Sequence, residues 1–355
     1  MDVAVVGGGI FGVTTAVELT QEFRDASVTL YERENDILRA ASGINQWRLH
    51  RGYHYPRSKS TASMCLESEQ AFLDKYSEAV ITDHDHHYCI ASERTKTTPK
   101  EYLEHCKSVG LAVECADLDV VVDESIDLCL RVNENHIDPL ALKTLAWRRL
   151  KQNRVDVRLN RAVESARDLA EKYDYVVVAA YAGTNALVRD YPALRREYKY
   201  QVIEKPVVTL PPQFDDLSIV IMDGPFMSVD PYGHTNRFQL DHVTWGVRHE
   251  HVGEQPELGD VNAELLNNGL VEGPPNTRFQ QFIDAYSEFF NDIERATHLG
   301  SYYTVRTVLP DKEETDARPT LVDRSENVFQ IFGGKIGTCV NAAAGVINSI
   351  SVDEN

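Results

Sequence analysis

The chain has 355 residues, of which 43% are hydrophobic and 26% charged, a composition typical of a globular protein long enough for two domains. Its net charge of −19 argues against nucleic acid or an anionic membrane as a partner, and no apolar run approaches the ~20 residues of a membrane helix. The six cysteines lack CxxC spacing, which favours reduced, mostly buried thiols in a cytoplasmic protein, and we predict no metal site.

The first strand-like segment, residues 3–6, ends in a glycine turn with the spacing Gly7-x-Gly9-x-x-Gly12, ahead of a helix-compatible segment. In this setting the first glycine permits the turn, the second lets backbone approach a pyrophosphate, and the third lets helix pack on strand. A second β-like run, residues 27–31, leads to Glu32, about 20 residues past the motif, where an acidic side chain can accept hydrogen bonds from a ribose. The pattern predicts a dinucleotide site. Because it begins at residue 2, we expect no signal peptide.

The next segment, residues 37–66, contains no Asp or Glu, although the overall composition predicts roughly five acids in thirty positions. Its cations and histidines are interleaved with aromatic residues: Arg39, Arg48, His50, Arg51, His54, Arg57 and Lys59, with Trp47, Tyr53 and Tyr55. We interpret the segment as a pocket wall facing an anion. The alternative is a solvated basic loop.

The later elements follow from periodicity and turn signals. Helices are expected at 60–76, at 99–109, after Asp138 as N-cap with Pro139 in the first turn, and at 279–293 with a buried aromatic stripe. Strands are expected at 88–91, 120–122, 128–132, 155–159, 174–180, 202–210, 219–222, 226–229, 238–241 and 244–248. The unbroken apolar run 174–180 is typical of a parallel strand covered on both faces, whereas turn residues between 200 and 249 favour an antiparallel sheet.

Several segments carry a family resemblance: GGGIFG (7–12), YER (31–33), ASGIN (41–45), HIDP (136–139), DYVVVAA (174–180), YTVR (303–306) and FGGKIG (332–337). Together they resemble the D-amino-acid oxidase (DAO) superfamily of FAD enzymes, which includes glycine oxidase, sarcosine oxidase and glycerol-3-phosphate dehydrogenase. The resemblance implies an α/β fold, with a Rossmann-type FAD-binding domain and a discontinuous α+β substrate domain built on an antiparallel sheet. We assign residues 1–80, 133–200 and 305–355 to the FAD-binding domain, and 81–132 and 201–304 to the substrate domain.

The resemblance also implies which residues contact FAD. They are Gly7, Gly9, Ile10, Phe11, Gly12, Glu32, Arg33, Ser42, Asn45, Val163, Ala180, Gly183, Gly333, Gly334, Lys335, Gly337 and Thr338. One departure is Tyr181, which stands where the family commonly has a glycine, and it puts the geometry of that turn in doubt.

For the reaction, the resemblance places Arg306 over the flavin, where it would pair with an anionic group of the substrate. Arg48 and Arg51 resemble the paired arginines of sarcosine oxidase, and Lys335 lies in the Gly-Gly-Lys signature. The candidate catalytic residues are Arg48, His50, Arg51, Tyr53, His54, Arg306 and Lys335.

We therefore predict an FAD-dependent oxidase or dehydrogenase that oxidises a CH–NH or CH–OH bond of a small anionic or polar substrate by hydride transfer to flavin N5. Oxidation of an alcohol usually needs a base, for which His50 or His54 is suited by pKa. We expect Arg51 and Arg306 to hold the substrate anion from opposite sides. The alternatives are a catalytically inactive FAD-binding protein and an enzyme like glycerol-3-phosphate or 2-hydroxy-acid dehydrogenase.

Overall fold

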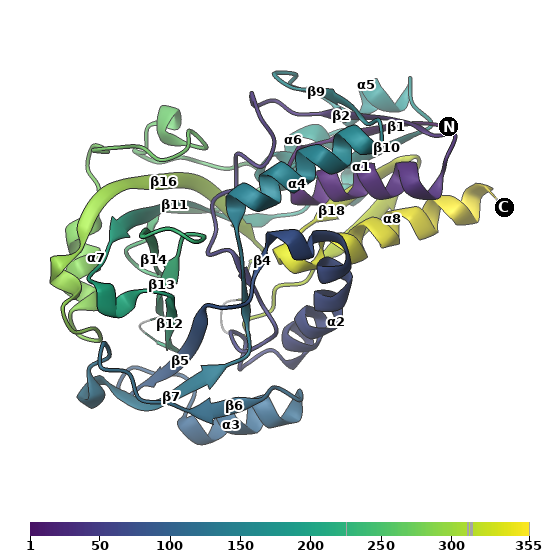
Figure 1. Ribbon diagram of the computed structural model, residues 1–355. Coiled ribbons are helices and arrows are strands. Elements are labelled where there is room, and N and C mark those ends of the chain that lie inside the picture. The colour runs from purple at the N-terminus through teal and green to yellow at the C-terminus, as the bar shows by residue number, and fades with distance from the viewer. Residues whose placement is uncertain (225, 311, 313–314, 355) are drawn as a thin grey trace.

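A computed structural model describes residues 1–355 except 225, 311, 313–314 and 355. Figure 1 shows a parallel sheet with α1, α4 and α8 beside it at the upper right, and an antiparallel sheet at the left. Both termini lie at the same end of the molecule, beyond the parallel sheet. The mixed α/β architecture agrees with the predicted fold class. The domain boundaries stay a prediction.

The parallel sheet is built around β1, which pairs with β2 on one side and with β10 on the other. In spatial order its strands are β17 (Leu321–Ser325), β18 (Val328–Phe332), β10 (Tyr175–Val178), β1 (Asp2–Val6), β2 (Ser27–Tyr31) and β9 (Asp156–Arg158). Only β17 runs antiparallel to its neighbour. One face of β1 packs through Val3 and Val5 in a core with Val13, and the other packs through Ala4 and Val6. The sheet is thus covered on both faces, as the apolar runs predicted.

The helices are α1 (Ile10–Glu22), α2 (Lys59–Tyr76), α3 (Pro99–Ser108), α4 (Pro139–Gln152), α5 (Ala166–Ala170), α6 (Thr184–Leu187), α7 (Phe279–Tyr286) and α8 (Cys339–Glu354). The predicted start of α4 is confirmed, since Asp138 accepts from the backbone N–H groups of Leu140 and Ala141, with Pro139 next to it. Such a cap satisfies N–H groups that have no partner inside the helix. Among the described residues, no helix is long and apolar enough to cross a membrane.

The second sheet is antiparallel except where β12 and β5 run parallel. In order its strands are β15 (Val247–Gly253), β11 (Tyr198–Thr209), β14 (Phe238–His242), β13 (Met227–Pro231), β12 (Leu217–Met222), β5 (Asp85–Ala91), β7 (Ile126–Val132) and β6 (Val113–Cys115), and β16 (Thr297–Val308) also pairs with β11. The ladder of β11 and β16 places Gln201 opposite Arg306, and its register shifts by one residue between Val207 and Val208.

A small sheet of β3 (Arg48–Leu49), β8 (Asn135–Ile137) and β4 (Val80–Ile81) joins these two parts. Within it Arg48 pairs with His136. This pairing ties the middle of the acid-free segment, at Arg48 and Leu49, to β8.

Two predicted elements are wrong for one shared reason. Residues 120–122 form no strand; they make a single antiparallel bridge between Val121 and Phe290. The helix predicted to reach 293 ends at Tyr286, because residues near Phe290 turn to hydrogen-bond with the 120–122 segment. The aromatic stripe is still core, since Phe282, Tyr286 and Phe290 are buried together.

The cysteines match the expectation of free and mostly buried thiols. All six are free, and only Cys115 among them is exposed.

Candidate functional site

A cavity of about 420 Å³ lies at the carboxyl ends of β1, β2, β10 and β18, within the ~300–1,000 Å³ range of ligand pockets. This is the edge of an open α/β sheet at which ligands bind. The cavity continues to the antiparallel sheet, where Ile203 and Lys205 of β11 and Thr304 and Arg306 of β16 line its far end.

Most of the predicted site residues line this one cavity. They are Gly7, Gly9, Ile10, Phe11, Glu32, Arg33, Ser42, Asn45, Val163, Ala180, Gly183, Gly333, Gly334 and Lys335, together with Arg48, His50 and Arg306. The structure therefore brings together segments that lie more than 300 residues apart in the chain.

The glycine turn has the close contacts that its motif predicts. A Cβ on Gly7, whose φ is +112°, would lie 2.4 Å from the carbonyl oxygen of Ala179. Gly12 does not line the cavity; a Cβ there would lie 1.9 Å from the Gly7 oxygen, so its role is the close packing of helix on turn. Larger residues at either position would force the turn apart.

Glu32 is held in place by backbone donors. Its carboxylate accepts the N–H of Gly8 at 2.5 Å and the N–H of Glu34 at 2.8 Å. A carboxylate has about four lone-pair sites, so both oxygens can still accept hydroxyl groups. Ser42 Oγ accepts the N–H of Ile10 at 3.0 Å, which joins the 41–45 segment to the first turn of α1. This end of the cavity fits a ribose and a pyrophosphate.

The C-terminal glycines lie against other segments of the cavity wall. A Cβ on Gly333 would lie 2.3 Å from the ring of Phe11, and one on Gly334 would lie 2.2 Å from the carbonyl oxygen of Arg318. Gly337 and Thr338 do not line the cavity. Thr338 instead donates its hydroxyl to the carbonyl of Lys335 at 2.7 Å, which shapes the turn before α8.

The structure shows how the unusual Tyr181 is accommodated. Its φ of +51° is the left-handed conformation that glycine adopts without steric penalty. Its hydroxyl donates to the carbonyl of Thr307 at 2.7 Å, and its ring stacks on Phe332. The turn therefore keeps a glycine-like conformation, and side-chain contacts offset part of its strain.

The cations of the acid-free segment are mostly neutralised by acids from elsewhere, so the prediction of a wall facing an anion is wrong for most of them. Arg48 is buried and pairs with Asp230 at 2.7 Å and Glu134 at 3.3 Å. Burial is the largest single effect and opposes its charge, but attraction to Asp230, Tyr88 and Glu134 together raises the Arg48 pKa. Arg57 pairs with Asp223 and Asp316.

The prediction of catalytic residues also needs correction at three positions, because the cavity is not lined by Arg51, Tyr53 or His54. Arg51 pairs with Glu69 at 2.8 Å, on the far side of the segment. Tyr53 donates its hydroxyl to the carbonyl of Ala112 at 2.7 Å. The His54 ring packs against Phe226, with 4.6 Å between ring centroids.

A turn begins at Gly52, between Arg51 and Tyr53, and the Gly52 carbonyl accepts the N–H of Tyr55 at 3.1 Å. Gly52 has a φ of +121°, and a Cβ there would lie 2.8 Å from the Cβ of Ala62. Of the predicted arginine pair, only Arg48 faces the cavity, and it is already neutralised.

His50 and Lys335 both line the cavity, and both have pKa values lowered by burial. Burial, followed by the nearby Lys335, lowers the pKa of His50 to about 4, although Glu134 lies 3.6 Å from its Nδ1. Burial, followed by Arg318, lowers the pKa of Lys335 to about 7. At pH 7 His50 is neutral, and Lys335 is close to its midpoint.

Arg306 is oriented without being neutralised. Its Nε and Nη2 donate to the side-chain oxygen of Gln201 at 2.8 and 2.5 Å. An amide oxygen is neutral, so the guanidinium keeps its full charge toward the cavity. Lys205 differs, because it pairs with Asp241 at 2.7 Å.

Sequence reasoning missed Glu134, Asp230, Gln201 and Lys205. Gln201 and Lys205 lie in β11, Asp230 lies in β13 and Glu134 lies between β7 and β8, and no local motif contains them. A polar residue inside a buried strand was the one signal available, because such a group requires a partner.

The fold and the cavity define the class of protein. A glycine turn and a fixed acidic residue at one end, with a cationic end beneath an antiparallel sheet, are the features of a dinucleotide-binding oxidoreductase. The chain belongs to the FAD dependent oxidoreductase (DAO) family, whose model matches residues 2–345. The predicted family and the predicted FAD cofactor are confirmed.

The residues present fit FAD. Besides the glycine turn and Glu32, the indole N–H of Trp47, a cavity-lining residue, is buried and has no hydrogen-bond partner among the described residues. A bound ligand can accept this hydrogen bond, since buried donors in proteins are normally paired.

Known proteins similar to this chain span different reactions. The chain is 25% identical to the FAD-dependent monooxygenase kojA of Aspergillus flavus, over 98% of this chain and 85% of the relative. It is 33% identical to the L-2-hydroxyglutarate dehydrogenase of Escherichia coli K12, over 20% of this chain and 17% of the relative. Among solved structures, glycine oxidase from Geobacillus kaustophilus matches with a TM-score of 0.72 at 14% identity, over 99% of this chain and 94% of that one.

Proposed function

We propose that this FAD-dependent oxidoreductase oxidises a small carboxylate at the carbon next to the carboxyl group, where that carbon bears nitrogen or oxygen. When bound, FAD supplies the hydride acceptor. The protein's own residues hold the anion, orient the substrate and keep the site free of competing charges.

The observation that carries the proposal is an imbalance of charge in the cavity. Arg48 and Lys205 line it but are paired with carboxylates, whereas Arg306 is held by a neutral amide. Lys335 also lines the cavity and forms no ion pair among the described residues. Arg39 and Arg161 line the cavity without an ion pair in the described part of the chain as well, but Arg306 and Lys335 are near enough to repel each other, and two such cations favour an anionic ligand.

The guanidinium of Arg306 presents a planar fork that matches a carboxylate in two parallel hydrogen bonds. Lys335 acts as a point charge whose Nζ lies 4.5 Å from the centre of the Tyr55 ring. Names of similar proteins agree with this chemistry, because glycine and L-2-hydroxyglutarate are both carboxylates.

The histidine environment favours a CH–NH bond over a CH–OH bond. A general base works best when its pKa is near the working pH, and burial lowers that of His50 to about 4. The other predicted base, His54, lies outside the cavity lining. Lys335 has a pKa of about 7, but in this proposal it is protonated and holds the carboxylate, so it is not the base. A neutral amine can transfer hydride without a strong base, so an amino acid suits this site better than a hydroxy acid.

The test is anaerobic reduction of the FAD-loaded protein by matched substrate pairs, followed through the loss of oxidised-flavin absorbance. Alanine is compared with lactate, and glutamate with 2-hydroxyglutarate, each as both stereoisomers. We expect an amino acid to reduce the flavin. Reduction by hydroxy acids alone would contradict the preference for nitrogen.

Arg306→Ala and Arg306→Lys form the matched variants. A charge-assisted hydrogen bond contributes ~1.5–3 kcal/mol, so the alanine variant should bind substrate roughly ten- to a hundredfold more weakly while retaining FAD. The lysine variant keeps the charge but loses the fork and should fall between. If no carboxylate reduces the flavin and none perturbs its spectrum, the protein binds FAD without this activity. Admitting oxygen to the reduced protein then identifies the acceptor by its rate of reoxidation.

A further inference from the structure

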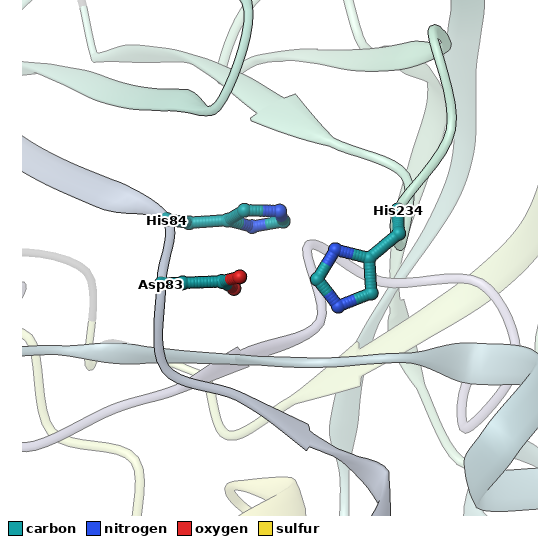
Figure 2. Close-up of side chains that lie close together, drawn as sticks. All are labelled: Asp83, His84 and His234. Carbon is teal, nitrogen blue, oxygen red and sulfur yellow. The ribbon is translucent and has the colours of Figure 1, made fainter.

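A cluster of potential metal ligands lies outside the FAD cavity, where two distant segments of chain meet. Asp83 and His84 lie between β4 and β5, and His234 lies in the turn between β13 and β14. Figure 2 shows Asp83 and His84 projecting side by side toward His234. One ligand atom from each residue lies within 4.8 Å of the other two.

Hydrogen bonds behind His84 fix which of its nitrogens faces the cluster. Nε2 of His136 lies 3.3 Å from the Asp230 carboxylate, and a carboxylate only accepts, so this nitrogen donates. In a neutral imidazole the other nitrogen, Nδ1, then accepts. Its partner is Nδ1–H of His84 at 2.9 Å. This leaves a lone pair on Nε2 of His84.

That lone pair is unused among the described residues. His84 is only 7% exposed. Among the described residues its Nε2 has no hydrogen-bond partner, and Oδ1 of Asp216 is 4.0 Å away. Metal-binding histidines typically donate their other ring N–H to a polar partner, which fixes the ring and its tautomer. The His84–His136–Asp230 arrangement has this form.

We propose that Asp83, His84 and His234 bind a divalent transition-metal ion, of which Zn²⁺ is the best match. Two imidazole nitrogens and one carboxylate oxygen are ligands that Zn²⁺ takes, with water in the fourth position. Zn–N distances of ~2.0–2.1 Å in a tetrahedral site place ligand atoms about 3.3 Å apart. The exposed side chains of Asp83 and His234 therefore move inward toward the buried His84.

Charge supports a cation at this position. Asp216 adds a second carboxylate beside His84, and its side chain is 76% exposed. The sequence contains one signal that our motif search did not use, the run Asp83-His84-Asp85-His86-His87, since short His-rich tracts often bind metals. The proposal revises the expectation of no metal site.

The ion would join the β13–β14 turn to the start of β5. Asp230, in the strand that leads into this turn, is also the partner of Arg48 in the FAD cavity. A metal ion at this site would therefore stabilise the β13–β14 turn, next to the strand that carries Asp230. The cavity itself is not lined by Asp83, His84 or His234.

The experiment is calorimetric titration of the FAD-loaded protein with Zn²⁺ after treatment with a chelator. A Cys115→Ser background removes the exposed thiol, which could itself bind zinc. We expect one stoichiometric site. His234→Ala should weaken it at least tenfold, and Asp83→Asn should weaken it as well.

The matched control is His251→Ala. His251 is another partly exposed histidine; it lies on β15, and its Nε2 is 3.5 Å from the Glu257 carboxylate. This variant should leave Zn²⁺ affinity unchanged. Equal losses in the His234 and His251 variants would mean dispersed weak binding and would overturn the proposal, as would the absence of a stoichiometric site.

A second measurement guards against misfolding. Zn²⁺ should raise the melting temperature of the Cys115→Ser protein and leave that of His234→Ala unchanged, since a ligand stabilises only the state that binds it. Equal rises in both would contradict the assignment. FAD content, measured by absorbance, should be the same in all variants.

Discussion

Lys335 provides a direct test of how the cavity binds anions. Its pKa is lowered to about 7 by burial, followed by repulsion from Arg318, with a further contribution from Arg306. It is therefore about half protonated at pH 7, about one tenth protonated at pH 8 and about one hundredth protonated at pH 9. Only the protonated form attracts a carboxylate.

The direction of the pH dependence follows from the linkage between anion binding and protonation of Lys335. A bound anion favours the charged lysine, so binding takes up a proton and weakens as pH rises. Affinity should fall about fivefold between pH 7 and 8 and about tenfold between pH 8 and 9. Neither a ligand carboxylate, with a pKa near ~4, nor His50, whose pKa is about 4, titrates in this window.

The assay is perturbation of the flavin spectrum by benzoate, a planar carboxylate, between pH 6 and 9 at fixed ionic strength. Lys335→Arg keeps its charge over this range and should give a flat profile up to pH 9. Lys335→Met should bind benzoate weakly at every pH. A flat profile in the unmodified protein, or the same slope in Lys335→Arg, would refute the reasoning.

Four further predictions concern positions whose roles the structure separates. Arg306→Ala should weaken substrate binding roughly ten- to a hundredfold with FAD retained, and an unchanged KM would remove Arg306 from the site. Arg51→Ala should lower the free energy of unfolding by about 1–3 kcal/mol, because it leaves the largely buried Glu69 carboxylate without its ion-pair partner, and should leave KM unchanged. Asp230→Ala leaves Arg48 without one of its buried partners and should cost about 3–5 kcal/mol by urea denaturation, so a loss as small as that of Arg51→Ala would contradict the pairing. Tyr181→Gly should be more stable than Tyr181→Ala by about 1–2 kcal/mol, because both lose the side chain but only glycine relieves the left-handed strain; equal stabilities would contradict that strain.

The sequence predicted the FAD-binding half of the site well because its determinants are local. The glycine turn, the acidic residue after β2 and the Asp138 cap each depend on residues a few positions apart or on one strand–turn–helix unit. Such patterns are visible without knowing the tertiary structure.

The substrate half depends on pairings between distant residues, which a pattern cannot show. The acid-free segment looked like an anion-binding surface because the acids that neutralise it, Glu134 and Asp230, lie far along the chain. The same limit applies to Phe290, whose bridge to Val121 ended a predicted helix early. In both cases a long-range contact overrode a local signal.

The pairing of Gln201 with Arg306 limits how the length of the chain can change. Side chains alternate between the faces of a strand, so a one-residue deletion within the regular part of this ladder would turn one of the two away from the cavity. Past the shift at Val207, β16 has an extra residue, Leu299, between the positions paired with β11. Deleting Leu299 would change the pairing only beyond that point. Homologous chains should therefore vary in length at this end of the β11–β16 ladder and keep constant length between it and the arginine.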